Sequence, residues 1–409
     1  MNNDDSLRHG MPRRRFVQLS ALAAGGVISG ALFTGAARAT AMSDDYKMTK
    51  KQPALTPRFA YVGSRTTKER GARGVGITVY SYQPETGACT LTQTLDDLVN
   101  PSFLTFDHQQ RHMYCVHGDQ SEVSSFSVDA LTGKLTKLNT VSTQGKNPVH
   151  LTVDPTNKYL AVANYATGSF ALIFIQQDGS LGALTHVEEL PGEPGPHKVE
   201  QVSSHPHMIP FDPSGRFLVV PDKGLDRIFV YRVQNNNASL AATQVSMVRT
   251  REGAGPRHIV FSLNAKYGYV VNELNSSITA YGFDAKKGVL TPAQTLPTLP
   301  AEFTGDSRAA AIVMAPSGRH VFVSNRGHDS IATYTLEQNG LLKANGHTDS
   351  QGRKPRFMNM TPDGQRLFVA NEETDTIVAF DVDPHSGGLT ASGQSIKTGS
   401  PVCMIFKTV

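Results

Sequence analysis

The sequence predicts an all-β protein, a seven-bladed β-propeller whose last blade is closed by the N- and C-terminal strands. Two observations lead to this fold class. A short unit, which nearly always starts with a proline and continues as an apolar strand, recurs at steps of 46 to 58 residues from Pro101 to Pro401. A polar turn and a second apolar strand follow each start before the last. Several short strands per repeat at this period are typical of a propeller with one sheet per repeat.

The starts of the repeats are similar tripeptides, one of which lacks the proline. They are Asn100-Pro101-Ser102, Asn147-Pro148-Val149, His205-Pro206-His207, Gly255-Pro256-Arg257, Ala309-Ala310-Ala311 and Lys354-Pro355-Arg356. The polar turn is clearest over residues 154–157 and 212–215, and second strands are clearest over residues 159–163 and 366–370. We therefore expect six complete blades in which a first strand, a turn and a second strand follow in this order.

The two ends of the chain complement each other. Residues 400–406 repeat a first strand and then stop, whereas residues 58–63 look like a second strand that lacks a first. We expect these segments to pair in a seventh blade, because closing the ring removes free sheet edges that would invite aggregation. The propeller domain is therefore expected over residues 58–409.

The first 39 residues have the order of parts that an export signal requires. Arg13 and Arg14 are followed, after one intervening residue, by two apolar residues, which matches the twin-arginine pattern. A mildly apolar stretch over residues 19–33 comes next, and Ala37-Arg38-Ala39 has the small residues of a cleavage site. The stretch is too short and too rich in glycine and alanine for a stable membrane anchor.

These features predict a twin-arginine signal peptide over residues 1–39, cleaved after Ala39, and a flexible leader over residues 40–57. The mature protein is then expected in the periplasm or outside the cell, with no membrane attachment. The partner of the precursor would be the twin-arginine export machinery.

Charge and cysteine content exclude some classes of function. The signal holds five arginines and two acids, which leaves 34 basic against 33 acidic groups from residue 40 onwards. This balance gives no basis for nucleic-acid binding. Cys89, Cys115 and Cys403 are an odd number without metal-ligand spacing. Cys115 and Cys403 stand in apolar strands, so we expect buried free thiols there.

The repeat also indicates where a site lies. Strands of a blade run up and down, so the start of the first strand and the end of the second lie on the same face, near the central channel. Residues that only support the scaffold would be similar in every blade at these two places. Polar residues of different kinds stand there instead. Just after the repeat proline stand His150, His207, Arg257, His258 and Arg356, and seventeen residues beyond the proline stand Tyr165, Lys223, Glu273, Arg326 and Glu372.

Structural explanations exist for each of these residues taken alone. A single charge at a strand end is about as often a solvated rim residue as a site residue. Asparagines at strand ends commonly bond their own backbone. His205-x-His207 could ligate a metal, but the neighbouring site positions are mainly arginines, which repel cations. The argument for a site therefore rests on convergence of many such residues on one face, and no metal or organic cofactor is expected.

At these motifs the chain resembles the seven-bladed propeller lactonases, a family that includes bacterial 6-phosphogluconolactonases and fungal carboxymuconate cyclases. The resemblance runs from about residue 58 to the C-terminus. It is carried by Gly255-Pro256-Arg257-His258, Asn272-Glu273-Leu274, residues 323–331, Asp154-Pro155, residues 162–165, His205-x-His207, Asp226-Arg227-Ile228 and Val369-Ala370-Asn371. It implies a catalytic set of His207, Arg257, Glu273 and Arg326. We add His150, His258, Arg356, Asn164, Asn272 and Asn325 as candidates for substrate binding.

Lactone hydrolysis suggests a role for each residue. His207 is the expected base, because an imidazole beside arginines tends to stay neutral near pH 7. Glu273 would orient His207 or take the proton of water itself. Arg257 is the expected donor to the oxyanion. Arg326 and Arg356 would hold a carboxylate or phosphate of the substrate through forked donors.

The implied activity is that of an exported lactonase acting on an aldonolactone or a related lactone. Phosphorylated sugar lactones arise in the cytoplasm, which this chain is expected to leave. One alternative is a cycloisomerase that closes a muconate-like diacid clamped by the arginines. A second is a propeller that binds a ligand or a protein without catalysis.

Overall fold

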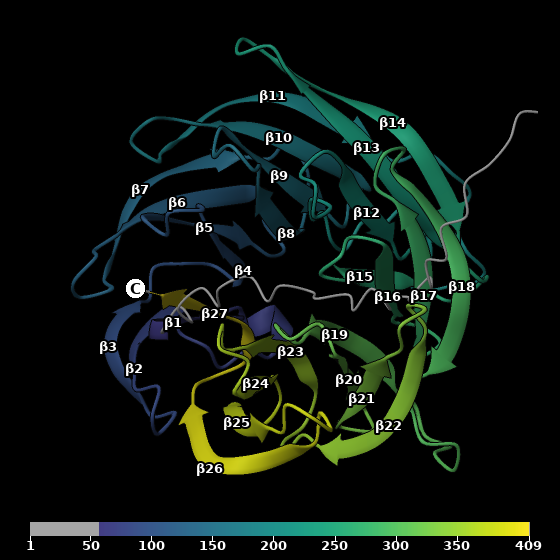
Figure 1. Cartoon of the computed structure of the whole chain (residues 1–409). Coiled ribbons are helices and arrows are strands. Elements are labelled where there is room, and N and C mark those ends of the chain that lie inside the picture. Colours follow the sequence, from purple (N-terminus) through teal and green to yellow (C-terminus); the bar gives the residue numbers. More distant parts are fainter. Residues whose placement is uncertain (1–56, 409) are drawn as a thin grey trace, which may run out of the picture. The chain divides into compact units, whose positions relative to one another are not determined.

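Seven β-sheets follow one another around a central channel as the blades of a propeller (Figure 1). The computed structural model describes residues 57–408. The predicted fold class is confirmed. The predicted signal peptide and nearly all of the predicted leader lie outside the described residues. Among residues 57–408, no helix is both long and apolar enough to span a membrane.

The blades are numbered here in chain order, and each is an antiparallel meander. Blade 1 comprises β1 (Pro57–Ser64), β2 (Ile77–Tyr82), β3 (Cys89–Leu95) and β27 (Pro401–Thr408). Blade 2 comprises β4 (Pro101–Phe106), β5 (His112–His117), β6 (Glu122–Val128) and β7 (Leu135–Ser142). Blade 3 comprises β8 (Pro148–Val153), β9 (Tyr159–Asn164), β10 (Ser169–Ile175) and β11 (Leu181–Glu189). Blade 4 comprises β12 (Leu218–Asp222), β13 (Arg227–Asn235) and β14 (Leu240–Arg249).

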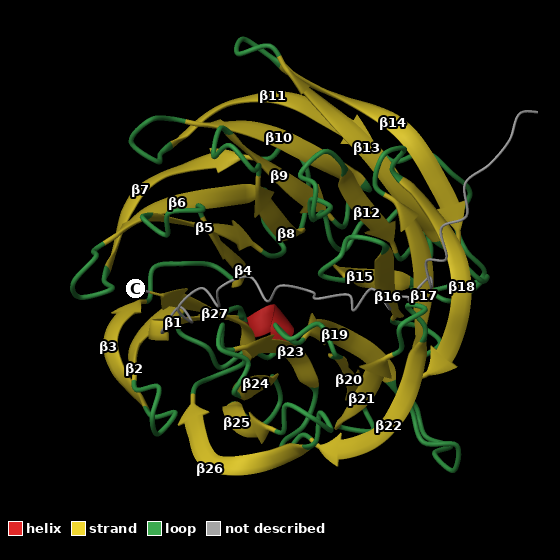
Figure 2. Ribbon diagram, viewed as in Figure 1, coloured by secondary structure: helices red, strands yellow, loops and turns green. Residues whose placement is uncertain are grey.

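The remaining three blades each have four strands. Blade 5 comprises β15 (Pro256–Phe261), β16 (Tyr267–Asn272), β17 (Ser277–Asp284) and β18 (Val289–Pro297). Blade 6 comprises β19 (Arg308–Met314), β20 (His320–Arg326), β21 (Ser330–Leu336) and β22 (Leu342–Asp349). Blade 7 comprises β23 (Pro355–Met360), β24 (Arg366–Asn371), β25 (Thr376–Val382) and β26 (Leu389–Lys397). One turn of 3₁₀ helix, η1 (Lys68–Arg70), follows β1 and is the only helix in the described part (Figure 2).

Blade 1 closes the ring as predicted. Strand β27 pairs antiparallel with β1, so that Ala60 lies opposite Phe406 and Val62 lies opposite Met404. The last residues of the described chain thereby supply the innermost strand of a blade whose other three strands come from its beginning.

Blade 4 departs from the prediction, because the segment that starts at His205-Pro206-His207 does not form a regular first strand. It meets β12 only through isolated bridges from Pro206 to Asp222 and from Phe211 to Leu218. The reason is the proline content of this pair of segments. Pro206 and Pro210 have no backbone N–H to donate, and β12 itself contains a proline. The backbone of His207 is still held by its N–H, which donates to the carbonyl of Pro221 at 3.0 Å.

The core consists of seven apolar clusters, and each fills one interface between neighbouring blades. Between blades 2 and 3, for example, Tyr114 and Val116 pack with Leu160 and Val162. Inward and outward residues alternate along each strand, so both faces of most blades bury apolar side chains against a neighbour. The two buried thiols, Cys115 and Cys403, are free as predicted.

Acidic residues between blades fix the starts of several first strands. The carboxylates of Asp226, Asp329 and Asp375 accept hydrogen bonds from the backbone N–H groups of Gly255, Lys354 and Ser400 at 2.7, 2.8 and 2.8 Å. Each of these N–H groups belongs to the residue before the repeat proline, where the backbone is left-handed. This contact sets the position of the residues that follow the proline, which are the ones predicted to face the channel.

Candidate active site

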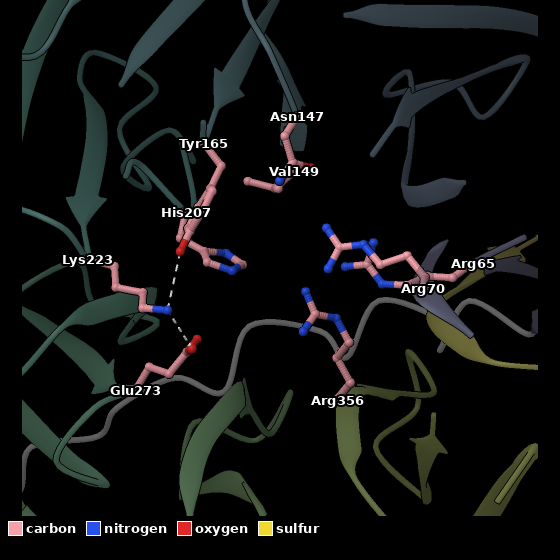
Figure 3. A pocket seen from close by; sticks show the side chains of 9 residues that line it. All are labelled: Arg65, Arg70, Asn147, Val149, Tyr165, His207, Lys223, Glu273 and Arg356. Atoms are coloured by element: carbon pink, nitrogen blue, oxygen red, sulfur yellow. Dashed lines mark hydrogen bonds and ion pairs between the residues drawn. The ribbon is translucent and has the colours of Figure 1, made fainter. Parts of the chain in front are cut away.

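A cavity of about 140 Å³ opens at the end of the channel where the first strands begin. The residues that line it are Arg65, Arg70, Asn147, Val149, Tyr165, His207, Lys223, Glu273 and Arg356 (Figure 3). A smaller space of about 20 Å³ continues below it and adds Arg257 and His258. The two spaces share four lining residues, which are Arg65, Val149, His207 and Arg356.

A β-bulge at the start of most first strands aims one side chain into this site. In blade 5, Pro256 lies opposite Asn272 and His258 lies opposite Val271, which leaves Arg257 as the extra residue. The same shift occurs in blade 7 and singles out Arg356. A bulge re-aims the side chain of its unpaired residue, so the residue directly after the proline faces the cavity.

Glu273 lies at the centre of the site and contacts three cations. Its Oε1 lies 2.9 Å from Nζ of Lys223, and its Oε2 lies 2.9 Å from Nε of Arg257 and 3.1 Å from Nη2 of Arg326. The contact with Arg257 is an ion pair by its distance rather than an aligned hydrogen bond. Burial by itself would raise the pKa of Glu273, but these cations outweigh it and hold the pKa well below its usual range. The carboxylate therefore stays ionised.

Lys223 has all three of its donors engaged. Besides Glu273, its ammonium group bonds Oε2 of Glu200 at 2.6 Å and the hydroxyl of Tyr165 at 3.3 Å. Burial would lower the pKa of Lys223, yet Glu273 and the other partners raise it above its ordinary value. Glu200 belongs to the loop between blades 3 and 4, so this loop reaches the site through Lys223.

Arg257 and Arg326 lie behind Glu273 and are each held by a backbone carbonyl as well. Nη1 of Arg257 donates to the carbonyl of Ala310 at 2.7 Å, and Nη2 of Arg326 donates to that of Ala309 at 3.2 Å. The side chain of Arg257 is only 3% exposed. Through these contacts the two arginines hold the carboxylate of Glu273 in place and connect it to β19, the first strand of blade 6.

Three other arginines turn their guanidinium groups toward the same space (Figure 3). Arg65 pairs with Glu372 at 3.2 Å, and Arg70 makes two bonds to Asp119. Arg356 makes no hydrogen bond or ion pair within residues 57–408. Burial and the neighbouring Arg356 charge lower the pKa of Arg65 to about 9. The crowding of cations at this mouth favours a ligand with negative charge.

His207 turns its ring into the cavity, opposite these arginines (Figure 3). In the described part of the chain neither ring nitrogen has a hydrogen-bond partner, and Nδ1 is fully buried. Burial, reinforced by the charge of Arg257, lowers the pKa of His207 well below its ordinary value of 6.5. This direction favours the neutral imidazole near pH 7, which is the form that a base requires.

The four residues of the predicted catalytic set thus lie together, although 119 positions separate His207 from Arg326 in the sequence. Their placement differs in depth, since His207 and Glu273 line the main cavity, whereas Arg257 lies below it and Arg326 lies behind Glu273. Of the added candidates, Arg356 lines both spaces and His258 lines the lower one.

His150 lies elsewhere in the channel. It lines a space of about 440 Å³ toward the opposite mouth, and His258 and Phe357 line both this space and the smaller one next to the main cavity. Burial lowers the pKa of His150 to about 3. It belongs to the wall of the channel rather than to the main cavity, so its prediction as a substrate ligand is not supported.

The three asparagines also do not reach the cavity. Asn164, Asn272 and Asn325 are at most 1% exposed, and their amide groups bond serine or threonine side chains at the start of the following strand. The reason is the alternation of side chains along a strand. Because Tyr165 and Glu273 point into the cavity, the asparagines directly before them must point into the blade.

Arg65 and Arg70 line the cavity but were absent from the predicted set. Ser64 lies opposite Pro401, so Arg65 occupies in blade 1 the position that Tyr165 and Glu273 occupy in their blades. The sequence register could have identified Arg65 if it had been extended to the split blade. Arg70 lies in η1, outside any strand, and no repeat position identifies it. Among residues 57–408, no group of three histidine, cysteine, aspartate or glutamate side chains is arranged so that it could hold a metal ion.

Comparisons with known proteins agree with this arrangement. Residues 59–406 match the family model described as Lactonase, 7-bladed beta-propeller. The 6-phosphogluconolactonase of Bacillus subtilis is 31% identical over 357 residues, which cover 86% of this chain and 99% of that protein. The 6-phosphogluconolactonase of Formosa agariphila is 30% identical over 363 residues, covering 85% and 99% respectively. The structure of the periplasmic gluconolactonase of Pseudomonas aeruginosa is 30% identical, covers 86% of this chain and 99% of its own, and superposes with a TM-score of 0.77.

The family model covers almost all of the described residues, and the relatives are matched over nearly their whole length. The resemblance seen in the sequence motifs is thereby confirmed. The chain belongs to the lactonase family of seven-bladed β-propellers, a family of lactone hydrolases.

Proposed function

We propose that this protein is an exported lactonase that hydrolyses an unphosphorylated sugar-acid lactone. The observation that carries the proposal is a cavity where Arg356, without a protein partner, faces the neutral ring of His207 (Figure 3). The guanidinium group of Arg356 can stabilise negative charge, and the neutral ring of His207 can accept a proton. Lactone hydrolysis needs both at the same carbonyl.

In the proposed reaction, His207 takes a proton from water while the water oxygen bonds to the lactone carbonyl carbon. The carbonyl oxygen becomes an oxyanion, which Arg356 stabilises through its forked donors. The bond from the carbonyl carbon to the ring oxygen then breaks. His207 returns its proton to that oxygen, and the products are a carboxylic acid and a free hydroxyl group.

The geometry changes the role that the sequence suggested for Arg257. Its donors are directed to Glu273 and to Ala310. A guanidinium group with such partners has little freedom to follow a developing oxyanion. Arg356 has no hydrogen bonds to the protein that it would have to break. Glu273 is also a poor base, because three cations keep its pKa low. We therefore assign Glu273, Arg257 and Arg326 the role of holding Lys223 and the shape of the cavity.

The experiment that tests this function is a hydrolysis assay of the mature protein with glucono-δ-lactone in a pH-stat, corrected for spontaneous opening. Arg356→Ala should lower kcat/KM about 10² to 10³-fold, the scale for losing one oxyanion donor. Arg356→Lys should recover part of the loss, since it restores charge without the fork. The melting temperature should change little, because Arg356 makes no hydrogen bond or ion pair in the described chain and interacts with Glu372 only through its charge. Full activity in Arg356→Ala would remove this residue from the mechanism.

Export is the second part of the proposal, and the twin arginines of the sequence support it. The Pseudomonas aeruginosa relative is named a periplasmic gluconolactonase, which fits a lactone made outside the cytoplasm. Replacing Arg13 and Arg14 by Lys should leave the precursor in the cytoplasm, because the twin-arginine pathway reads the guanidinium pair. Cell fractionation followed by immunoblotting measures this. Normal appearance of the Lys variant in the periplasm would point to another export route.

A further inference from the structure

Tyr165 lines the main cavity together with His207 and Lys223. It directly follows β9, the second strand of blade 3. The residues at the same position of the seven blades, in chain order, are Arg65, Gly118, Tyr165, Lys223, Glu273, Arg326 and Glu372. Five of them are charged and one is glycine, so Tyr165 is the only uncharged proton donor that the repeat supplies at this position.

Contacts with His205 fix the orientation of Tyr165. The ring of His205 lies nearly parallel to the tyrosine ring, with 4.4 Å between the ring centroids and 8° between the planes. Nδ1 of His205 also donates to the backbone carbonyl of Tyr165 at 2.9 Å. The backbone N–H of His205 is held in turn by the carboxylate of Asp222 at 2.8 Å. The tyrosine hydroxyl is thereby kept in the cavity, next to Lys223 (Figure 3).

The hydroxyl group of Tyr165 has a hydrogen that no protein group uses. Its oxygen accepts a hydrogen bond from Nζ of Lys223 at 3.3 Å. An ammonium group can only donate, so the hydroxyl hydrogen takes no part in this contact. Within residues 57–408 this hydroxyl group makes no other hydrogen bond. The hydrogen is therefore available to a ligand in the cavity.

Tyr165 also keeps this proton near pH 7. Burial raises the pKa of Tyr165 above its ordinary value of 10, although Lys223 acts in the opposite direction. A neutral phenol can protonate an alkoxide, because the corresponding alcohol is a weaker acid. Lys223 is not suited to this task, since all three of its donors are engaged and its own pKa is raised.

Tyr165 and His207 lie beside the same part of the cavity. Their rings meet edge to face, with 5.5 Å between the centroids and 78° between the planes. The ring oxygen of a lactone is bonded directly to the carbonyl carbon. A base that activates water for that carbon and an acid that protonates that oxygen must therefore be close neighbours, as these two side chains are.

We propose that Tyr165 is the acid that protonates the ring oxygen when the lactone opens. This inference rests on the proposed function and adds one proton transfer to it. When the bond from the carbonyl carbon to the ring oxygen breaks, the electron pair stays on the oxygen, which takes the hydroxyl hydrogen of Tyr165. The positive charge of Lys223 stabilises the resulting tyrosinate. The tyrosinate then takes up the proton that His207 received from water, so this proton reaches the ring oxygen by way of Tyr165.

The nature of the leaving oxygen tests this role, because a weakly basic leaving group needs less help from an acid. Glucono-δ-lactone opens to an alcohol, whereas dihydrocoumarin is a δ-lactone that opens to a phenol, a group with a pKa of about 10. Tyr165→Phe should lower kcat for glucono-δ-lactone about 10²-fold, a typical scale for general acid catalysis, with little change in KM. Its kcat for dihydrocoumarin should stay close to that of the wild type.

His207→Gln is the matched control, since both lactones need an activated water, and it should lower kcat for both by similar factors. The melting temperature of Tyr165→Phe should stay close to that of the wild type, because Lys223 keeps both of its carboxylate partners. The role of Tyr165 is overturned if Tyr165→Phe slows the two lactones equally or slows neither. If the wild type opens neither lactone, or if His207→Gln slows neither, the proposed function itself is contradicted.

Discussion

Glu273 is the residue that ties the candidate site together, and the proposed mechanism gives it no part in the reaction itself. Both of its oxygens are taken by cations that come from three different blades. A carboxylate in this position joins Lys223 of blade 4 to Arg326 of blade 6 across the start of blade 5. In the proposed mechanism, Glu273 supports activity by holding the cavity wall in this geometry.

Removal of Arg257 should therefore affect stability as well as turnover. Arg257→Ala takes away one of the three cations of Glu273 and leaves the carbonyl of Ala310 without its donor. Breaking a buried ion pair typically costs about 3 kcal/mol or more, so the free energy of unfolding in urea should fall by roughly that amount. Arg356→Ala is the matched control, since it removes an arginine of the same cavity without a protein partner. Equal stability of the two variants would contradict this account of Arg257.

The pH dependence of turnover should reflect the low pKa of His207. In the proposed mechanism His207 is the base and must be deprotonated to act, and burial and the charge of Arg257 lower its pKa below 6.5. The active form is therefore present above that lowered pKa and is lost only as the pH falls through it. We expect kcat/KM to stay level between pH 6.5 and pH 7.5, with the acid limb below 6.5. An acid limb centred at or above 6.5 would assign the profile to a different group.

The sequence predicted part of this site well, and physical reasons explain where it did not. The repeat register placed His207, Glu273 and Arg356 correctly, because residues at equal positions of a repeat face the same way. It misplaced Asn272, since neighbouring residues of a strand point to opposite sides. It did not reach Arg70, which stands in an irregular segment with its own local geometry.

At the level of elements, the bulges after Pro256 and Pro355 connect backbone pairing to the position of a site arginine. In these two blades the residue before the proline is anchored by an aspartate of the preceding blade, and the residue after the proline is turned into the site. The sequence shows the proline and the aspartate, but not the bulge. A pattern of apolar residues specifies that a strand exists, whereas a bulge changes the pairing by one residue and leaves the composition unaltered.

This link can be tested by removing the same anchor at two blades. Asp329→Ala deletes the acceptor for the N–H of Lys354, two residues before Arg356, and Asp375→Ala deletes the acceptor for the N–H of Ser400. Both should lower the free energy of unfolding by roughly 1 to 3 kcal/mol, at about 1 kcal/mol for each hydrogen bond lost, because Asp329 also accepts from the N–H of Gly327 and Asp375 also accepts from Nε of Arg73. Only Asp329→Ala should also lower kcat/KM, because only there does the freed strand carry Arg356, the arginine proposed to stabilise the oxyanion. Equal losses of activity would show that the anchor does not direct Arg356.

At the scale of the whole molecule, closure of the ring depends on β27, the last strand in the chain order. Strand β27 contributes Cys403 to the cluster shared with blade 2, and Met404 and Phe406 to the cluster shared with blade 7. Both interfaces of blade 1 therefore need the end of the chain, although most of that blade is synthesised first. A single strand thus joins the two ends of the sequence and holds two of the seven interfaces.

Met404→Ala should show whether the ring unfolds as one unit. Met404 is 1% exposed, and truncating such a side chain costs about 2 to 5 kcal/mol. If ring closure couples all blades, Met404→Ala should still unfold in a single transition, with its midpoint at a lower urea concentration than in the wild type. Fluorescence and circular dichroism should report the same midpoint, and activity should be lost there too. Leu131→Ala, at a side chain that is 86% exposed, should change stability by less than about 0.5 kcal/mol. An early transition that exposes blade 1 while activity persists would mean that β27 secures its own blade and not the ring.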